Sequence, residues 1–176
     1  RSSGKMGFAL ASEAARRGAE VQLITGPTSL ATPQGVVRID VGTALEMRDA
    51  VLSALPAASI VIKASAVADY RPRQREAGKR KKEDLPADGS WNLELVENPD
   101  ILKEVCERKG SRIVVGFAAE SADVANAARR KIRRKGCDLL VANDVSRPDA
   151  GFDVDTNAVL LVTPGVLTDF FGLALL

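Results

Sequence analysis

The sequence predicts an α/β fold, Rossmann-like and in three layers, with a mostly parallel sheet and one long flap. Apolar runs of strand length alternate along its 176 residues with segments of helical periodicity, which is typical of parallel strands covered by helices. The segment at about 68–90 follows neither pattern and is rich in proline and charge. Long irregular segments in compact domains are often functional, so we interpret it as the flap of a single domain, 1–176.

Each predicted element follows from its local pattern. The predicted strands are residues 21–25, 36–41, 60–64, 91–95, 113–117, 139–142 and 158–162. The predicted helices are residues 6–17, 43–55, 98–110, 121–135 and 167–176. Gly18 and Gly136 are natural helix ends. Thr43 opens a capping-box pattern, and Asn98 is predicted to cap a helix whose first position is Pro99.

Composition and charge exclude several classes of function. The sequence contains no histidine, which excludes a Ser-His-Asp triad, a Cys-His pair and any zinc site that needs histidine. Any metal should be a hard ion held by oxygen, such as Mg²⁺. The net charge of +2 creates no strong field, and no apolar run is long enough to span a bilayer. We therefore expect no nucleic-acid partner and no membrane partner.

The two cysteines indicate the cellular location, and the first residues indicate whether the domain is complete. Cys106 and Cys137 form no disulfide framework, and no signal peptide is visible. A reduced, cytoplasmic setting is the expectation. The sequence begins with Arg1 and opens directly on a helix-entry motif, so we expect an N-terminally truncated domain.

The opening residues can form a phosphate site. Ser2, Gly4 and Gly7 lie where a helix is predicted to begin. Free N–H groups and the positive end of the helix dipole bind anions there, and glycines let a phosphate approach the backbone. The alternative is an ordinary serine cap with small residues for packing. A Walker A loop is excluded, because Met6 follows Gly4-Lys5 where that motif needs Ser or Thr.

Two lysines lie on the packing side of predicted helix 121–135. At 100° per residue, Lys131 and Lys135 share a stripe with Val124 and Ala128. Lysine is rarely buried unless it is paired. These side chains therefore either extend past the helix end or face an anion in a cleft, which would offset their mutual repulsion.

Further candidates follow the predicted strands. Asp69 lies after strand 60–64, at the edge where open α/β sheets bind ligands. It could bind Mg²⁺ or a polar group of a substrate, or it could cap a turn. Phe117, at the end of another strand, could stack on a base or belong to the core. Asn143 and Asp144 are interpreted as turn residues.

The flap contains a basic run that starts at Lys79. It is either a solvated loop or a flap that closes over a reacting phosphate and stabilises developing charge. A nucleic-acid site is disfavoured, because no aromatic residues are interleaved with the basic ones.

Together these segments resemble the phosphopantothenoylcysteine synthetase family. The matching stretches, in the family's order, are SSGKMGFALA, SAVADYRP, GKRKK, ELVENPDIL, VVGFAAES, ARRKIRRKGCDLLVANDV and GFDVDTNAVLLV. They cover most of the chain. The resemblance implies a ligase of coenzyme A biosynthesis that joins 4′-phosphopantothenate to L-cysteine. It also implies CTP with Mg²⁺: the carboxylate attacks the α-phosphate of CTP to give an acyl-cytidylate and pyrophosphate, and the amine of cysteine then displaces CMP.

The resemblance also implies roles for individual residues. Its nucleotide positions fall on Ser2, Gly4, Gly7, Asp69, Lys79, Asn98, Pro99, Asp100, Ile101, Phe117, Lys131 and Lys135. Its phosphopantothenate positions fall on Ala66 and Asp69. Lys79 is the family's candidate for stabilising charge during activation, so Lys79 and Asp69 are the expected catalytic residues. No residue is assigned to Mg²⁺.

This chain departs from the family in what precedes its first helix. The family has a strand, a Gly-Gly-Thr loop and an Asn there, none of which lies in this chain, and Ser65 replaces an alanine. Bacterial members are often fused to an FMN-dependent decarboxylase, so FMN would belong only to a fused half ahead of residue 1. Members are commonly homodimers, and we expect the partner surface at 91–95.

Two other functions are alternatives to the ligase. An NAD(P)-dependent Rossmann oxidoreductase needs a G-x-G-x-x-G loop after its first strand and an acidic residue after its second. Here the strand ending at Thr25 continues into Gly26-Pro27 without an acid. A non-catalytic nucleotide-binding module would keep the phosphate contacts but would not need a lysine in a flap.

Overall fold

The structure, a computed structural model, describes residues 3–74, 78, 81, 88, 90–120, 123–144, 156–165 and 167–174. Its helices are α1 (Lys5–Arg16), α2 (Ala44–Ala54), the 3-10 turn η1 (Leu55–Ala57), α3 (Ile101–Glu107) and α4 (Val124–Lys135). Its strands are β1 (Val21–Thr25), β2 (Val36–Asp40), β3 (Ile60–Lys63), β4 (Tyr70–Pro72), β5 (Leu95–Glu97), β6 (Ile113–Glu120), β7 (Leu139–Asp144), β8 (Thr156–Val162) and β9 (Leu167–Ala174).

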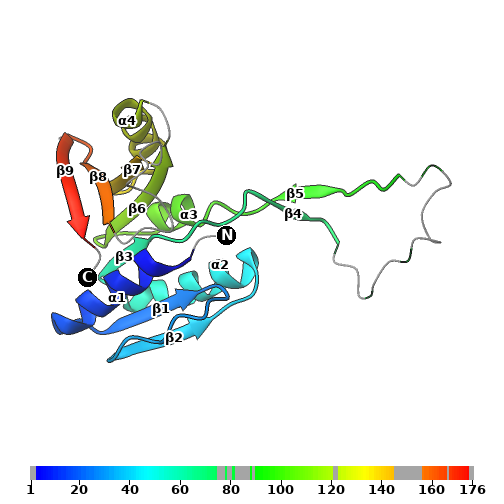
Figure 1. Cartoon of the computed structure of the whole chain (residues 1–176), viewed down its shortest axis with the longest axis horizontal. Coiled ribbons are helices and arrows are strands. Elements are labelled where there is room, and N and C mark those ends of the chain that lie inside the picture. The colour runs from blue at the N-terminus through cyan, green and yellow to red at the C-terminus, as the bar shows by residue number, and fades with distance from the viewer. Residues whose placement is uncertain are drawn as a thin grey trace.

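Parallel strands form the centre of the fold, as predicted. The largest sheet has the order β3-β6-β7-β8-β9, in which β3, β6 and β7 are parallel and β8 and β9 complete the edge in antiparallel fashion. Strands β1 and β2 form a second, parallel pair. Figure 1 shows α1, α2 and this pair on one side of β3, and α4 with the rest of the large sheet on the other. The α/β class is therefore confirmed.

The core is densest where α3 and α4 cover the large sheet. Val114 on β6, Ala128 on α4 and Leu140 on β7 are fully buried, and Val105 on α3 is 1% exposed. Full burial of one such aliphatic side chain contributes about 1.5–3 kcal/mol. This core fixes the carboxyl ends of β3, β6 and β7 relative to α3 and α4, and it is at those ends that the candidate site lies.

Helix ends follow the predicted signals except in α3, which ends at Glu107 instead of near Gly110 and also begins later than predicted. Gly18 and Gly136 adopt the left-handed conformation, with φ of 87° and 77°, as expected after α1 and α4. Thr43 accepts the backbone N–H of Glu46 at 3.1 Å, which confirms the predicted cap of α2. The cap of α3 is Asp100 instead of Asn98, because the Asp100 carboxylate accepts the backbone N–H of Lys103 at 3.1 Å. The predicted helix start at Asn98 is therefore wrong by two residues.

The predicted flap begins and ends in a two-stranded arm, made of residues 68–74 and 90–98. Strands β4 and β5 pair in antiparallel fashion, and the arm extends away from the body of the molecule (Figure 1). The predicted strand at 91–95 is displaced, since β5 covers Leu95–Glu97. The prediction that one face of this strand is buried is also wrong, because Trp91 and Leu93 are 54% and 50% exposed.

The last element is a strand, and the predicted terminal helix is wrong. Residues Leu167–Ala174 form β9, which pairs with β8 from Val162↔Leu167 to Thr156↔Ala174. A neighbouring strand with free hydrogen-bonding groups stabilises the extended form more than the weak local helical pattern does. Among the described helices, none combines the length and apolar composition needed to cross a membrane.

Candidate functional site

The carboxyl ends of β3, β6 and β7 meet at one edge of the large sheet. Because these strands are parallel and in register, Lys63 lies beside Gly116, and Ala119 lies beside Asn143. The loop after β3 therefore emerges beside the ends of β6 and β7. Ligands bind at this edge in open α/β sheets, so we call this region the carboxyl edge.

Asn98 ties the arm to the loop after β3. Its backbone N–H donates to the carbonyl of Asp69 at 2.7 Å, and its side-chain amide donates to the carbonyl of Ala68 at 2.8 Å. Arg71 donates to the Asn98 side chain at 3.2 Å. Asn98 thus holds predicted site residue Asp69 close to the start of α3.

The two stripe lysines of α4 face carboxylates at the same edge. Lys135 pairs with Asp100, the cap of α3, and Lys131 lies 3.6 Å from Glu120 at the end of β6. Their side chains are only 15% and 27% exposed. The predicted position on the packing side of the helix is confirmed, because both lysines reach across from α4 to the sheet and α3.

The electrostatics at this edge keep Asp100 ionised. Partial burial acts to raise the pKa of Asp100, but hydrogen bonds from Lys135 and from the Lys103 N–H outweigh burial and leave the pKa below its usual value. Burial lowers the pKa of Lys63, with Asp100 opposing the shift and Lys135 and Lys131 adding to it. Charged groups of both signs are therefore concentrated at this edge.

The amino end of α1 has the backbone form of an anion site. Gly4 caps the helix in the left-handed conformation, with φ of 82°, and a Cβ atom on Gly7 would meet nothing within 4 Å. The hydroxyl of Thr28 donates to the carbonyl of Ser3 at 3.4 Å. A cavity of about 390 Å³ adjoins this loop, at the carboxyl ends of β1 and β2. It is lined by Pro27, Thr28, Arg38, Asp40, Val41 and Gly42.

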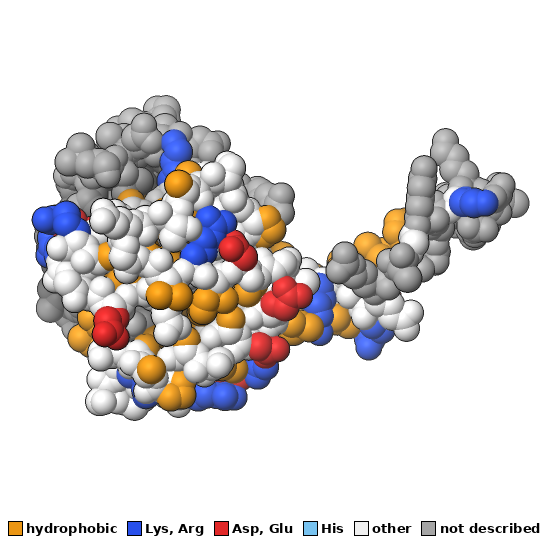
Figure 2. Space-filling view, turned by 90° about the horizontal axis from the view of Figure 1, so that it is seen from below, with side chains coloured by type: hydrophobic (Ala, Val, Ile, Leu, Met, Phe, Trp, Pro, Cys, Tyr) orange, Lys and Arg blue, Asp and Glu red, His pale blue; other side chains and the backbone are white. Residues whose placement is uncertain are grey.

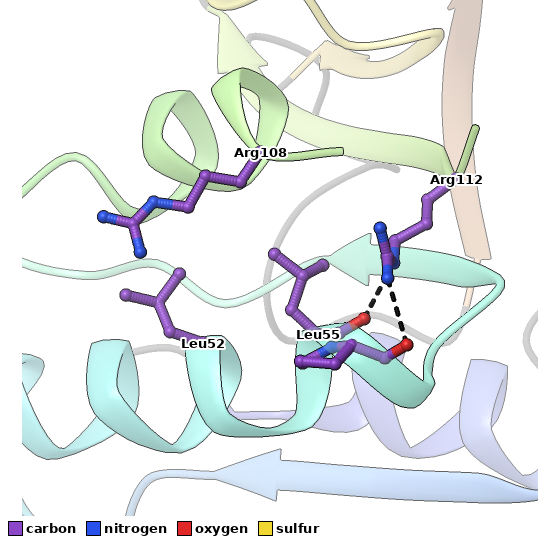
Figure 3. Close-up of a pocket in the computed structure, with 5 residues that line it drawn as sticks. Leu52, Leu55, Arg108 and Arg112 are labelled. Atoms are coloured by element: carbon purple, nitrogen blue, oxygen red, sulfur yellow. Dashed lines mark hydrogen bonds between the residues drawn. The ribbon is translucent and has the colours of Figure 1, made fainter. Parts of the chain in front are cut away.

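A second cavity lies away from the carboxyl edge. It measures about 240 Å³ and is lined by Leu52, Leu55, Pro56, Arg108 and Arg112. Figure 3 shows Arg112 directed at the backbone of η1, where it donates to the carbonyls of Leu55 and Pro56 at 2.7 and 3.0 Å. Since Arg112 directly precedes β6, this pocket is at the amino end of the strands and contains none of the predicted site residues.

The remaining predicted site residues differ in accessibility. Ala66 and Asp69 are exposed in the loop after β3, and Phe117 is half-buried on β6. Ile101 is only 3% exposed and belongs to the core, so only its backbone could reach a nucleotide. Pro99 is half-buried at the base of the arm. Ser2 and Lys79 lie outside the described residues.

Three residues of this edge were missed by sequence reasoning. Lys63 ends the otherwise apolar strand β3. A charged residue at the end of such a strand could have indicated a site residue. Glu120 was missed because β6 continues three residues beyond its predicted end. Asn143 was interpreted as a turn residue, which is wrong: it lies within β7, and its Oδ1 atom is buried without a hydrogen-bond partner in the described part of the chain. Such an acceptor needs a donor from water or from a ligand.

The acidic side chains and the two thiols of the described residues form neither a metal cluster nor an activated nucleophile. Within the described ranges, no three cysteine, aspartate or glutamate side chains gather into a metal site. Burial raises the pKa of Cys106 to about 11, and burial also raises the pKa of Cys137. Both thiols therefore stay protonated at neutral pH and are poor nucleophiles.

Comparison with known proteins identifies the family. Residues 1–169 match the family described as DNA/pantothenate metabolism flavoprotein C-terminal domain. The chain belongs to this family. It is 49% identical over 162 residues to the Coenzyme A biosynthesis bifunctional protein CoaBC of Bacillus subtilis, covering 92% of this chain and 39% of that protein. For the CoaBC protein of Escherichia coli the identity is 50% over 161 residues, covering 91% of this chain and 39% of that protein.

A solved structure supports the same family at the level of the fold. The chain resembles the crystal structure of the C-terminal domain of a CoaBC protein, with a TM-score of 0.79 and 37% sequence identity, covering 99% of this chain and 78% of that one. The predicted phosphopantothenoylcysteine synthetase resemblance and the Rossmann-like class are confirmed by these matches. The chain spans about two fifths of the length of the curated relatives it matches.

Proposed function

We propose that this chain is the ligase domain of a phosphopantothenate–cysteine ligase of coenzyme A biosynthesis. One observation carries the proposal: Asn98 contacts Asp69, and Asp100, two positions further along, pairs with Lys135, so three distant segments of the chain meet at the carboxyl edge. Each of these four residues falls on a nucleotide position implied by the family resemblance. Family membership also argues against the NAD(P)-dependent oxidoreductase.

The proposed reaction has two steps. A carboxylate oxygen of 4′-phosphopantothenate attacks the α-phosphate of CTP, the bond to the β-phosphate breaks, and pyrophosphate leaves with that electron pair. The amine of L-cysteine then attacks the acyl carbon, CMP leaves, and the amine loses a proton as the amide forms. Lys131 and Lys135 bind phosphate oxygens in this proposal, and the amino end of α1 with Gly4 and Gly7 supplies backbone N–H donors.

Lys79 and Asp69 are the proposed catalytic residues. An ammonium that reaches the reacting phosphate from the flap would stabilise the charge that develops there, which is the role proposed for Lys79. Asp69 and Ala66, exposed after β3, would contact 4′-phosphopantothenate. The aromatic ring of Phe117, half-buried on β6, would contact the nucleotide.

Mg²⁺ would accompany the nucleotide instead of occupying a protein-only site. Mg²⁺ at nucleotide sites is usually held by substrate phosphates, water and one or two carboxylates. The absence of a three-residue acidic cluster among the described residues fits that arrangement. The ion would neutralise part of the charge on the triphosphate.

We also propose that the arm is a homodimer surface. Tyr70, Trp91, Leu93 and Leu95 are each at least 50% exposed, and Figure 2 shows hydrophobic side chains along the arm. Aromatic and aliphatic side chains in one exposed group are typical of protein interfaces. A second copy of the chain is the proposed partner, and the cytoplasm is the proposed location.

Pyrophosphate release tests the proposed function. The full-length protein is mixed with CTP and Mg²⁺, and pyrophosphate is measured in a single turnover with and without 4′-phosphopantothenate. We expect release only when 4′-phosphopantothenate is present, together with an acyl-cytidylate that L-cysteine consumes. Binding of CTP without any pyrophosphate release would favour the non-catalytic nucleotide-binding module instead.

A further inference from the structure

Lys63 is a lysine in an unusual place. It ends β3 after Ile60, Val61 and Ile62, and its side chain is half-buried. Its ammonium donates to the carbonyl of Ser65 at 2.8 Å. A lysine removed from water in this way normally has an anionic partner.

The side chain of Lys63 lies on the sheet face that α3 and α4 cover. Side chains alternate along a strand, so Lys63 shares a face with Val61. Val61 packs against the hydrophobic core, which includes Leu102 of α3 and Ile132 of α4. Lys63 therefore extends this packed face to the carboxyl edge.

The charged groups around Lys63 come from three elements. Asp69 lies in the loop after β3, Asp100 caps α3, and Lys131 and Lys135 come from α4. The two α4 lysines already contact the carboxylates of Glu120 and Asp100. Lys63 instead donates to a neutral carbonyl, and no carboxylate of the described residues lies within 4 Å of its ammonium. It is thus the lysine of this cluster whose charge is least compensated.

We propose that Lys63 binds the triphosphate of the nucleotide, as a third ammonium beside Lys131 and Lys135. This inference rests on the proposed function and adds a residue that the family resemblance does not assign. A triphosphate supplies several anionic oxygens, so it can satisfy Lys63 while the α4 lysines also contact phosphate. Hydrogen bonds between ammonium and phosphate are among the strong ones in proteins.

Binding of CTP to single variants tests this inference. The dissociation constant is measured by isothermal titration calorimetry for the full-length wild-type protein, Lys63→Met, Lys63→Arg and Lys103→Met. We expect Lys63→Met to weaken CTP binding about tenfold, the equivalent of one charge-assisted contact, and Lys63→Arg to keep most of the affinity. Lys103→Met removes the same charge from an exposed side chain of α3 and should change affinity less than about twofold.

The outcomes separate this inference from the proposed function. Equal affinities of wild type and Lys63→Met for CTP would overturn the role of Lys63 alone, and so would equal losses in Lys63→Met and Lys103→Met. A wild-type protein that binds no CTP would overturn both proposals.

A second measurement needs no variant. The acetylation rate of each lysine is measured by mass spectrometry on the wild-type protein, with and without CTP. We expect CTP to protect Lys63 at least as strongly as Lys131. Protection of Lys131 without protection of Lys63 would overturn the inference.

Discussion

The ammonium of Lys135 on α4 pairs with the carboxylate of Asp100, the residue that caps α3. The same carboxylate accepts the backbone N–H of Lys103, so one side chain both caps a helix and positions a lysine. Because the pKa of Asp100 lies below its usual value, the carboxylate remains charged at neutral pH. The pair fixes where α4 presents positive charge at the carboxyl edge.

Lys135→Met should weaken CTP binding by about tenfold or more, for two reasons. The proposed phosphate contact is lost, and the unpaired Asp100 carboxylate would then repel the triphosphate. Asp100→Asn in the Lys135→Met background should therefore restore part of the affinity, since Asn also caps helices well. Dissociation constants for the single and double variants, measured by calorimetry, check both parts.

Arg134→Met is the matched control for Lys135→Met. It removes one positive charge from the same last turn of α4, but from an exposed side chain. Its CTP affinity should stay within about twofold of wild type. An unchanged dissociation constant in Lys135→Met would mean that this lysine only joins α4 to α3.

Lys79→Gln should slow activation and leave CTP binding nearly intact. A flap ammonium that acts on developing charge contributes to the transition state more than to the ground state. We expect the single-turnover rate of pyrophosphate release to fall at least about tenfold, which corresponds to about 1.4 kcal/mol. Lys81→Gln, in the same flap, should change the rate much less. Equal losses of binding and rate in Lys79→Gln would exclude a charge-stabilising role.

Local sequence signals predicted the elements whose structure is set locally. Gly18 and Gly136 follow the ends of α1 and α4 and adopt the left-handed backbone conformation. Glycine adopts this conformation readily, so both helix ends could be predicted from the sequence. The lysine stripe of α4 follows from helical periodicity alone. Both the glycine helix ends and the lysine stripe depend only on residues close together in the sequence.

Elements that depend on distant partners were predicted less well. Residues Leu167–Ala174 are a strand because β8 pairs with them, and no local pattern reveals that partner. Asn98 does not cap α3 because its Oδ1, the atom that would accept a helix N–H, accepts from Arg71, while its amide donates to Ala68, 30 positions away. The pairing of Lys131 with Glu120 likewise required knowing that β6 extends beneath α4.

Trp91→Ala should shift the protein from dimer toward monomer. Trp91 is 54% exposed on the arm, and tryptophans at interface centres commonly contribute 2 kcal/mol or more. We therefore expect the dimer dissociation constant, measured by sedimentation velocity, to rise about thirtyfold or more. Val37→Ala removes an apolar side chain that is 62% exposed on β2 and should have no such effect. A monomeric wild-type protein would rule out the arm as a homodimer surface.

Gly116→Ala should destabilise the fold by about 1–3 kcal/mol through overpacking. A Cβ atom at this position of β6 would lie 2.8 Å from Leu102 and 3.2 Å from Leu140. Both leucines are buried, at 5% and 0% exposure, so neither can move aside freely. Urea denaturation measures the loss. Gly26→Ala, where a Cβ would meet nothing within 4 Å, should shift the midpoint little, and an equal shift in both variants would contradict the packing argument.

Asp138→Asn should lower stability at neutral pH but not in acid. Asp138 lies just before β7, where its carboxylate accepts the ammonium of Lys109 at 2.5 Å and the N–H of Val114 at 2.8 Å. These two contacts lower its pKa. Because the folded-state pKa is below the unfolded one, the stabilisation is complete above about pH 4 and disappears as the pH falls through the folded-state value.

The magnitude and the pH profile together test this ion pair. The Asp138 side chain is 40% exposed, so solvent screening limits the expected loss in Asp138→Asn to about 1 kcal/mol at pH 7. The free energies of unfolding of wild type and Asp138→Asn, measured by urea denaturation from pH 7 down to acid, should converge as the carboxylate becomes protonated. Asp49→Asn, at a carboxylate that is 70% exposed, should differ from wild type by less than about 0.5 kcal/mol throughout. A constant difference between wild type and Asp138→Asn at every pH would show that the charge of Asp138 contributes nothing and that only its shape matters.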